Sequence, residues 1–130
     1  ELNMHFVNSH FMHPDDLLDK DRGAALGWEK LRARLDEYMT WMNESAPSLR
    51  NLTGSELAGA VQRYGALTVD KEITDQEIRI HLGNFYDEAY LMVRINDGTP
   101  GQVTGGELTN VTGNLYLLHA QESEVVIERN

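Results

Sequence analysis

The sequence contains no cysteine and only 3 prolines, and its 11 lysine and arginine residues are outnumbered by 21 aspartate and glutamate residues. The absence of cysteine excludes a disulfide framework and thiolate zinc sites. The net charge of -10 argues against nucleic acids and anionic membrane surfaces as partners, because both require lysine and arginine to neutralise phosphate. A neutral or cationic partner, such as a sugar polymer, is compatible with this charge.

Long apolar runs are also missing. No segment approaches the roughly 20 apolar residues of a membrane span, so no membrane-spanning helix is expected. The 130 residues are 41% hydrophobic and 25% charged, as in a globular protein with a real hydrophobic core.

Three elements are expected before residue 66. An apolar-rich run predicts a short strand at residues 2–8, and a helix is predicted over residues 24–45. A second helix follows Thr53, which has capping-box spacing to Glu56, and runs to about Arg63. The first helix is predicted from apolar side chains that recur three and four residues apart, namely Trp28, Leu31, Leu35, Tyr38 and Met42.

From residue 66 the apolar period changes to two, which is typical of strands. Five or six short strands with one apolar face indicate an antiparallel sheet or small β-sandwich. The predicted fold class is therefore α+β, with a strand and two helices in residues 1–65 and a β domain in residues 66–130. Turn signals separate the strands at Asp97-Gly98, Pro100-Gly101, Gly105-Gly106 and Gly113-Asn114.

A cluster of titratable side chains, His10, His13, Asp15 and Asp16, follows the first expected strand. Strand ends are where α/β scaffolds build their sites. Two imidazoles and a carboxylate are suitable ligands for a divalent metal, and one histidine beside a carboxylate is suitable as a general acid. The structural alternative is a polar loop in which His10 ends the strand and the aspartates cap a short helix.

Exposed aromatic side chains are candidates for stacking on sugar rings. Tyr86 lies in a predicted loop and is the best candidate, and Tyr90 is close by. Trp28 belongs to the apolar stripe and is expected in the core, whereas Trp41 is off that stripe. From their places on or near strands, His81 and His119 are expected at the surface or at the edge of the core.

Three stretches together resemble the C-terminal part of bacterial polysaccharide deacetylases, such as those of the Pel biofilm system: residues 9–19, residues 46–53 with 60–64, and residues 80–87. The resemblance implies a distorted (β/α) barrel that removes N-acetyl groups from an amino-sugar polymer. It implies an Asp-His-His metal triad, an aspartate base, and a histidine general acid near the end of the last barrel strand. Only that last motif matches this chain, where it assigns the acid to His10, with His13 as second choice.

The resemblance further implies that this chain is the tail of a larger enzyme and is inactive in isolation. The divalent metal, zinc by preference, belongs to the complete enzyme, and no metal ligand is assigned to this chain. The partners are the remainder of the barrel and an amino-sugar polysaccharide, which Asp15, Asp16 and Tyr86 would contact. The implied location is the periplasm or the exterior of a bacterium.

Two other interpretations remain open. His13-Pro14-Asp15-Asp16 also resembles the motif of LmbE-like zinc deacetylases, in which the histidine and the second aspartate bind zinc and the first aspartate is the base. Leu17 and Leu18 follow here, where that family usually has an acid. A functional alternative of another class is a non-catalytic β module that binds carbohydrate or docks a protein.

Overall fold

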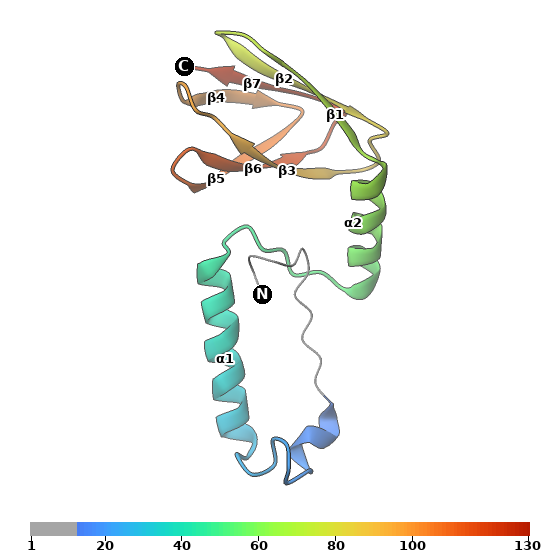
Figure 1. The fold of residues 1–130 in the computed structure, drawn as a ribbon, viewed down its shortest axis with the longest axis vertical. Coiled ribbons are helices and arrows are strands. Elements are labelled where there is room, and N and C mark those ends of the chain that lie inside the picture. Colours follow the sequence, from blue (N-terminus) through green and yellow to red (C-terminus); the bar gives the residue numbers. More distant parts are fainter. Residues whose placement is uncertain (1–12) are drawn as a thin grey trace. The chain divides into compact units, whose positions relative to one another are not determined.

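The computed structural model describes residues 13–130 (Figure 1). The expected strand at residues 2–8 and the candidate His10 lie outside the described residues. The chain divides into two compact units, one ending at Leu49 and the other spanning Arg50–Asn130. This division groups the second helix with the strands, whereas the boundary expected at residues 65 and 66 marks the change from helix to strand.

The first unit contains a short 3-10 helix, η1 (Pro14–Leu17), and the long helix α1 (Trp28–Ser45). Along the predicted stripe of α1, Met42 is buried and the preceding members are half-buried. Trp28 is the exception: 51% of its surface is exposed, so its predicted core position is wrong. As the first residue of α1, directly after Gly27, it lies at the end of the stripe.

The second unit begins with helix α2 (Gly54–Ala66), which leads into the first strand (Figure 1). The predicted capping box is present: the Thr53 N–H donates to Glu56 Oε2 at 2.7 Å, and the Glu56 N–H donates to the Thr53 hydroxyl at 3.4 Å. The bond from the Thr53 N–H, followed by one that the Thr53 hydroxyl donates to Glu56 Oε2 at 2.8 Å, holds the pKa of the Glu56 carboxyl below its usual value. Neither α1 nor α2 combines the length and apolar character that crossing a membrane requires.

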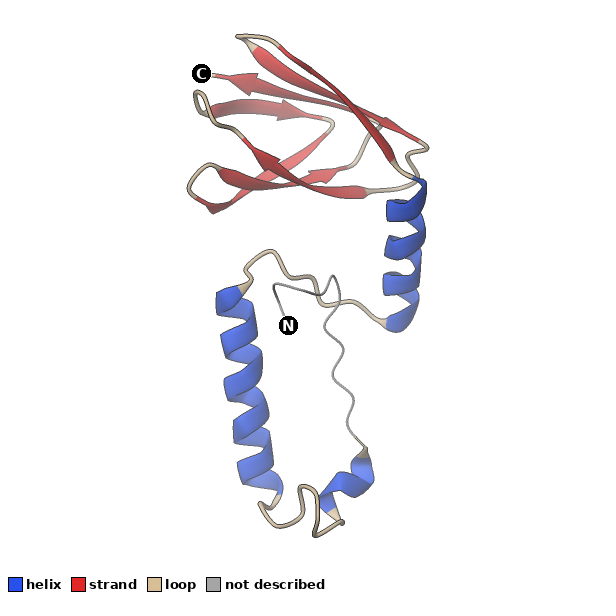
Figure 2. Ribbon diagram, viewed as in Figure 1, coloured by secondary structure: helices blue, strands red, loops and turns tan. Residues whose placement is uncertain are grey.

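The strands of the described residues form two antiparallel sheets that face each other (Figure 2). One sheet has the order β1-β2-β7-β4 and the other β3-β6-β5. The α+β fold class, with helices followed by antiparallel sheets, is therefore confirmed, and the sheets do not close into a barrel. The strands are β1 (Thr68–Ile73), β2 (Glu77–Gly83), β3 (Ala89–Arg94), β4 (Pro100–Thr104), β5 (Gly106–Thr112), β6 (Leu115–Ala120) and β7 (Glu124–Arg129).

The hydrophobic core lies between the two sheets. Leu118 from β6 and Val125 and Ile127 from β7 have no exposed surface, and β2 and β3 complete the cluster. Full burial of one such side chain contributes about 1.5–3 kcal/mol to folding. The period-two alternation therefore arises because one face of each central strand is turned toward the facing sheet.

The turn expected at Pro100-Gly101 is wrong, because both residues lie in β4, whereas of the pair Gly105-Gly106 the first residue bends the chain between β4 and β5 and the second begins β5. Pro100 begins β4, an edge strand, where its missing N–H removes no ladder hydrogen bond. Gly105 connects the two strands with φ +80, and a Cβ there would lie 2.1 Å from the carbonyl oxygen of Glu124. Pro100 therefore lies in an edge strand of one sheet, and Gly105 lies where the chain crosses from that sheet to the other.

Candidate functional site

The titratable cluster near the N-terminus is partly described, and it caps η1. The His13 N–H donates to Asp16 Oδ2 at 3.0 Å, and Arg22 Nη1 donates to Asp16 Oδ1 at 2.7 Å. The bond from Arg22, followed by that from His13, holds the pKa of the Asp16 carboxyl below its usual value. Both oxygens of Asp16 therefore have structural partners within the first unit.

Asp15 is placed differently. Its Oδ1 lies 3.6 Å from His13 Nδ1, and both side chains are more than half exposed. The structure thus brings His13 and Asp15 together as an open imidazole–carboxylate pair. Across residues 13–130, no three His, Asp or Glu side chains gather closely enough to hold a metal ion.

An open pocket of about 100 Å³ lies in the second unit, lined by α2, the loop between β2 and β3, and the residues around them. Its lining consists of Arg50, Ala60, Arg63, Tyr64, Leu67, Asn84, Tyr86, Glu88, Ala89 and Tyr90. Pockets that enclose a whole small molecule measure about 300–1,000 Å³. This one therefore accommodates one substituent of a ligand whose remainder lies outside.

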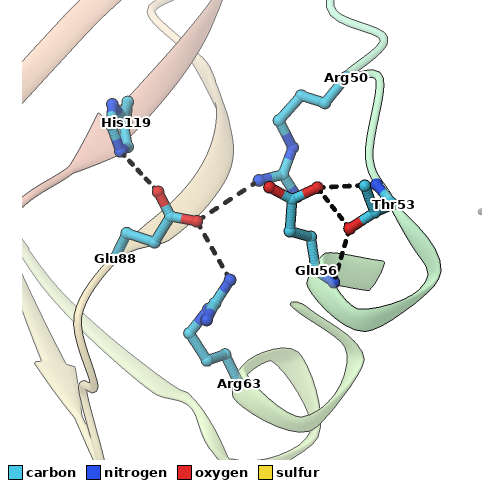
Figure 3. A network of polar contacts seen from close by, with 6 residues as sticks. All are labelled: Arg50, Thr53, Glu56, Arg63, Glu88 and His119. Atoms are coloured by element: carbon cyan, nitrogen blue, oxygen red, sulfur yellow. Dashed lines mark hydrogen bonds and ion pairs between the residues drawn. The ribbon is translucent and has the colours of Figure 1, made fainter. Parts of the chain in front are cut away.

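Glu88 is the centre of a polar network at this pocket (Figure 3). Its Oε1 accepts a hydrogen bond from Arg63 Nη2 at 3.1 Å and lies 3.9 Å from Arg50 Nη1. Its Oε2 lies 3.1 Å from His119 Nε2. All four side chains are between 23% and 32% exposed. Partial exclusion of water makes these contacts stronger than those of fully exposed ion pairs.

An aromatic ring stack adjoins the network. Tyr90 on β3 and His119 on β6 are opposite each other in the ladder, and their rings stack 4.3 Å apart with an interplanar angle of 5°. The Arg50 guanidinium carbon lies 3.7 Å from the centre of the Tyr90 ring, which is a cation–π contact. The Arg50 guanidinium is thus held by an aromatic face as well as by the charge of Glu88.

Two further tyrosines stand at the rim of the pocket. Tyr64 in the last turns of α2 is 74% exposed and Tyr86 in the β2–β3 loop is 75% exposed. The Asn84 side chain donates to the Ala66 carbonyl at 3.1 Å, which ties the loop to the end of α2. Tyr86 is therefore presented to solvent from a loop that is held in place.

The structure separates the candidate residues that the sequence singles out. His13, Asp15 and Asp16 belong to the first unit, Tyr86 belongs to the second, and His10 lies outside the described residues. The network around Glu88 is not apparent from the sequence, where His119 is expected at the surface or the core edge. The one signal available was that Arg50 and Arg63 lie in residues 46–53 and 60–64, for which the sequence predicts a likeness to deacetylases.

Residues 1–117 match the sequence model of a protein family described as "Uncharacterised protein conserved in bacteria (DUF2194)". The match extends over both compact units and ends within β6. A search of the curated proteins gave no match, and neither did a search of the solved structures.

Proposed function

We propose that this chain, which belongs to the bacterial family DUF2194, is the C-terminal portion of an exported polysaccharide deacetylase and that residues 50–130 hold the N-acetylated amino-sugar polymer. One observation carries this proposal. Two of the three stretches that resemble such deacetylases contribute to one pocket, the first with Arg50, Arg63 and Tyr64 and the second with Asn84 and Tyr86. The fold brings these two stretches, which are separate in the sequence, to one pocket, and the shared task that we assign to them is binding.

The side chains at the pocket suit a sugar chain. The exposed faces of Tyr64 and Tyr86 are apolar surfaces on which the C–H face of a pyranose ring packs, and each carries a hydroxyl that hydrogen-bonds. Guanidinium groups donate to hydroxyl and carbonyl oxygens, and the Asn84 carbonyl accepts. A pocket of about 100 Å³ receives one ring substituent, such as an acetamido group, while the polymer crosses the rim.

In the reaction, the histidine acid is assigned to His10, with His13 as second choice. The Asp15 carboxylate lies 3.6 Å from His13 Nδ1, which is beyond hydrogen-bond distance and close enough for charge attraction to a protonated imidazole. The metal triad and the aspartate base are contributed by the rest of the complete enzyme. As an exported enzyme, the protein would work in the periplasm or outside the cell.

The catalytic part of the proposal is tested by measuring acetate release from the N-acetylated polymer by the complete protein. His10→Ala is expected to lower the rate by about 10²–10⁴-fold, the usual contribution of a general acid. His13→Ala tests the second choice in the same assay. His81→Ala, which alters an exposed histidine on β2, is the control. Full activity of both the His10→Ala and the His13→Ala enzymes would exclude an acid in this segment.

The binding part is tested by calorimetry of the 130-residue chain with tetramers of N-acetylglucosamine and of N-acetylgalactosamine. Tyr86→Ala is expected to weaken binding by about two- to tenfold, because a stacked aromatic contributes about 0.5–1.5 kcal/mol. Tyr86→Phe keeps the ring and loses only the hydroxyl, so it should bind more tightly than Tyr86→Ala does. Trp28→Ala removes an exposed aromatic from α1, outside the pocket, and is the matched control. If neither tetramer binds, residues 50–130 do not hold the polymer.

A second candidate function is favoured by the position of the pocket, whose lining residues all belong to the second unit. Residues 50–130 would then be a carbohydrate-binding module with no catalytic role for the chain. Oligosaccharide binding together with unimpaired activity of both histidine variants would favour this alternative over the first proposal.

A further inference from the structure

We propose that the pocket distinguishes N-acetylated from deacetylated amino sugars and that Arg50 sets this preference. The inference rests on the proposed function, and it identifies which form of the polymer the site retains. The enzyme's substrate carries a neutral acetamido group, whereas its product carries an ammonium group. A site that binds the acetamido group and rejects the ammonium group retains those stretches of polymer that have not yet been deacetylated.

The argument begins with the charges of the pocket. Its lining contains two guanidiniums, Arg50 and Arg63, and one carboxylate, Glu88. The carboxylate is already shared, since Oε1 contacts both guanidiniums and Oε2 contacts His119. One positive charge in the lining is therefore not compensated, and Glu88 has no carboxylate oxygen left without a partner for an incoming cation.

The uncompensated charge belongs to Arg50. Arg63 makes the shorter contact to Glu88, at 3.1 Å, and is neutralised by it. Arg50 lies 3.9 Å from the carboxylate, is engaged with the Tyr90 ring and is 32% exposed. A charge that is partly shielded from water acts through a lower effective dielectric, so Arg50 exerts the stronger effect on a ligand group that enters the pocket.

The two sugar substituents differ in charge and in hydrogen bonding. An acetamido carbonyl accepts a hydrogen bond, and a guanidinium can only donate, so the pair is complementary. An ammonium group can only donate and is positively charged, so it meets both a donor–donor mismatch and charge repulsion. Mismatch and repulsion of this kind select against the wrong ligand more strongly than weak attraction selects for the right one.

The side chains that line the pocket carry a net positive charge, whereas the chain as a whole has a net charge of -10. At low salt the acidic surface attracts a cationic polymer from a distance. That attraction fades beyond about 8 Å at physiological ionic strength, whereas the contact with the pocket does not. The deacetylated polymer is therefore expected to associate loosely and in a salt-dependent way, without entering the pocket.

The test compares two probes on the 130-residue chain at about 0.15 M salt: the N-acetylglucosamine tetramer and its fully deacetylated counterpart. Calorimetry is expected to show at least about tenfold tighter binding of the acetylated tetramer. Arg50→Gln should reduce that ratio to about threefold or less, and Arg50→Lys, which keeps the charge, should preserve most of it. Arg79→Gln is the matched control, because Arg79 pairs with Glu77 on β2 and is not part of the pocket lining.

A second measurement needs no variant. Raising the pH to about 9 deprotonates the sugar amine, so binding of the deacetylated tetramer to the wild-type chain should tighten while that of the acetylated tetramer stays constant. Equal or tighter binding of the deacetylated tetramer at neutral pH, abolished by Tyr86→Ala, overturns the inference and leaves the proposed function standing. Failure of both tetramers to bind overturns the proposed function and this inference with it.

Discussion

Replacing Glu88 by glutamine should destabilise the second unit, because three positively charged or protonatable groups converge on its carboxylate. The substitution keeps the size of the side chain and removes its charge. The contacts to Arg63 and to His119 are each 3.1 Å long, and the Arg50 contact is 3.9 Å. A hydrogen bond to a charged group contributes about 1.5–3 kcal/mol when buried, and at 29% exposure of the Glu88 side chain the total loss should be about 1–2 kcal/mol.

The assay is urea unfolding followed by circular dichroism, since a loss of this size shifts the midpoint clearly and should leave the slope unchanged. The same loss corresponds to a fall in Tm of about 4–15 °C for a domain of this size. Glu77→Gln is the control: it removes the same charge from an exposed ion pair with Arg79 and should have no measurable effect. If Glu88→Gln unfolds at the same urea concentration as Glu77→Gln, the network does not stabilise the unit and the reasoning is refuted.

Three further predictions concern the fold. Leu118→Ala, at a residue with no exposed surface, should cost about 2–5 kcal/mol of unfolding free energy in the same assay; a smaller loss would mean that the core repacks. Gly105→Ala should be strongly destabilising, because it combines φ +80 with a backbone oxygen 2.1 Å from the new Cβ, whereas Gly65→Ala in α2, with open space around it, should be neutral or stabilising. Thr53→Ala should destabilise the unit at neutral pH and do so somewhat less as the pH falls. The backbone N–H bond, which is the larger cause of the lowered pKa of Glu56, remains in this variant, and only the hydroxyl bond to the carboxylate is lost. The hydroxyl's share of the stabilisation is present above the unfolded pKa and is lost as the pH falls through the folded one. A Thr53→Ala effect of the same size at neutral and acidic pH would contradict that cause.

Much of the local structure could be predicted from the sequence. The capping box at Thr53 and Glu56 and the period of the α1 stripe involve residues within one or two turns of each other. The alternation of buried and exposed side chains along β2 could be predicted from the sequence of that strand alone. The exposure of Tyr86 follows from its place in a loop between two strands. In each case the physical cause lies within a few residues of its effect.

The errors have a common origin. Pro100 and Gly106 have turn-forming composition, but one begins an edge strand and the other lies close against β6. Trp28 fits the apolar stripe, yet it lies where the stripe ends. Whether a strand is at the edge of a sheet, or a stripe is covered along its whole length, depends on elements that lie elsewhere in the chain.

By itself the sequence determined that two helices precede antiparallel strands and that the chain is acidic, because propensity, capping and periodicity act over short distances. It left open whether the strands form one sheet or a small sandwich, which the tertiary structure decided. Only the tertiary structure decided that Glu88 meets Arg50, Arg63 and His119, residues of three other segments. Charged side chains on a surface follow no period that reveals their partners, and it is the pairing of β3 with β6 and the placement of α2 beside them that bring these groups within hydrogen-bonding distance.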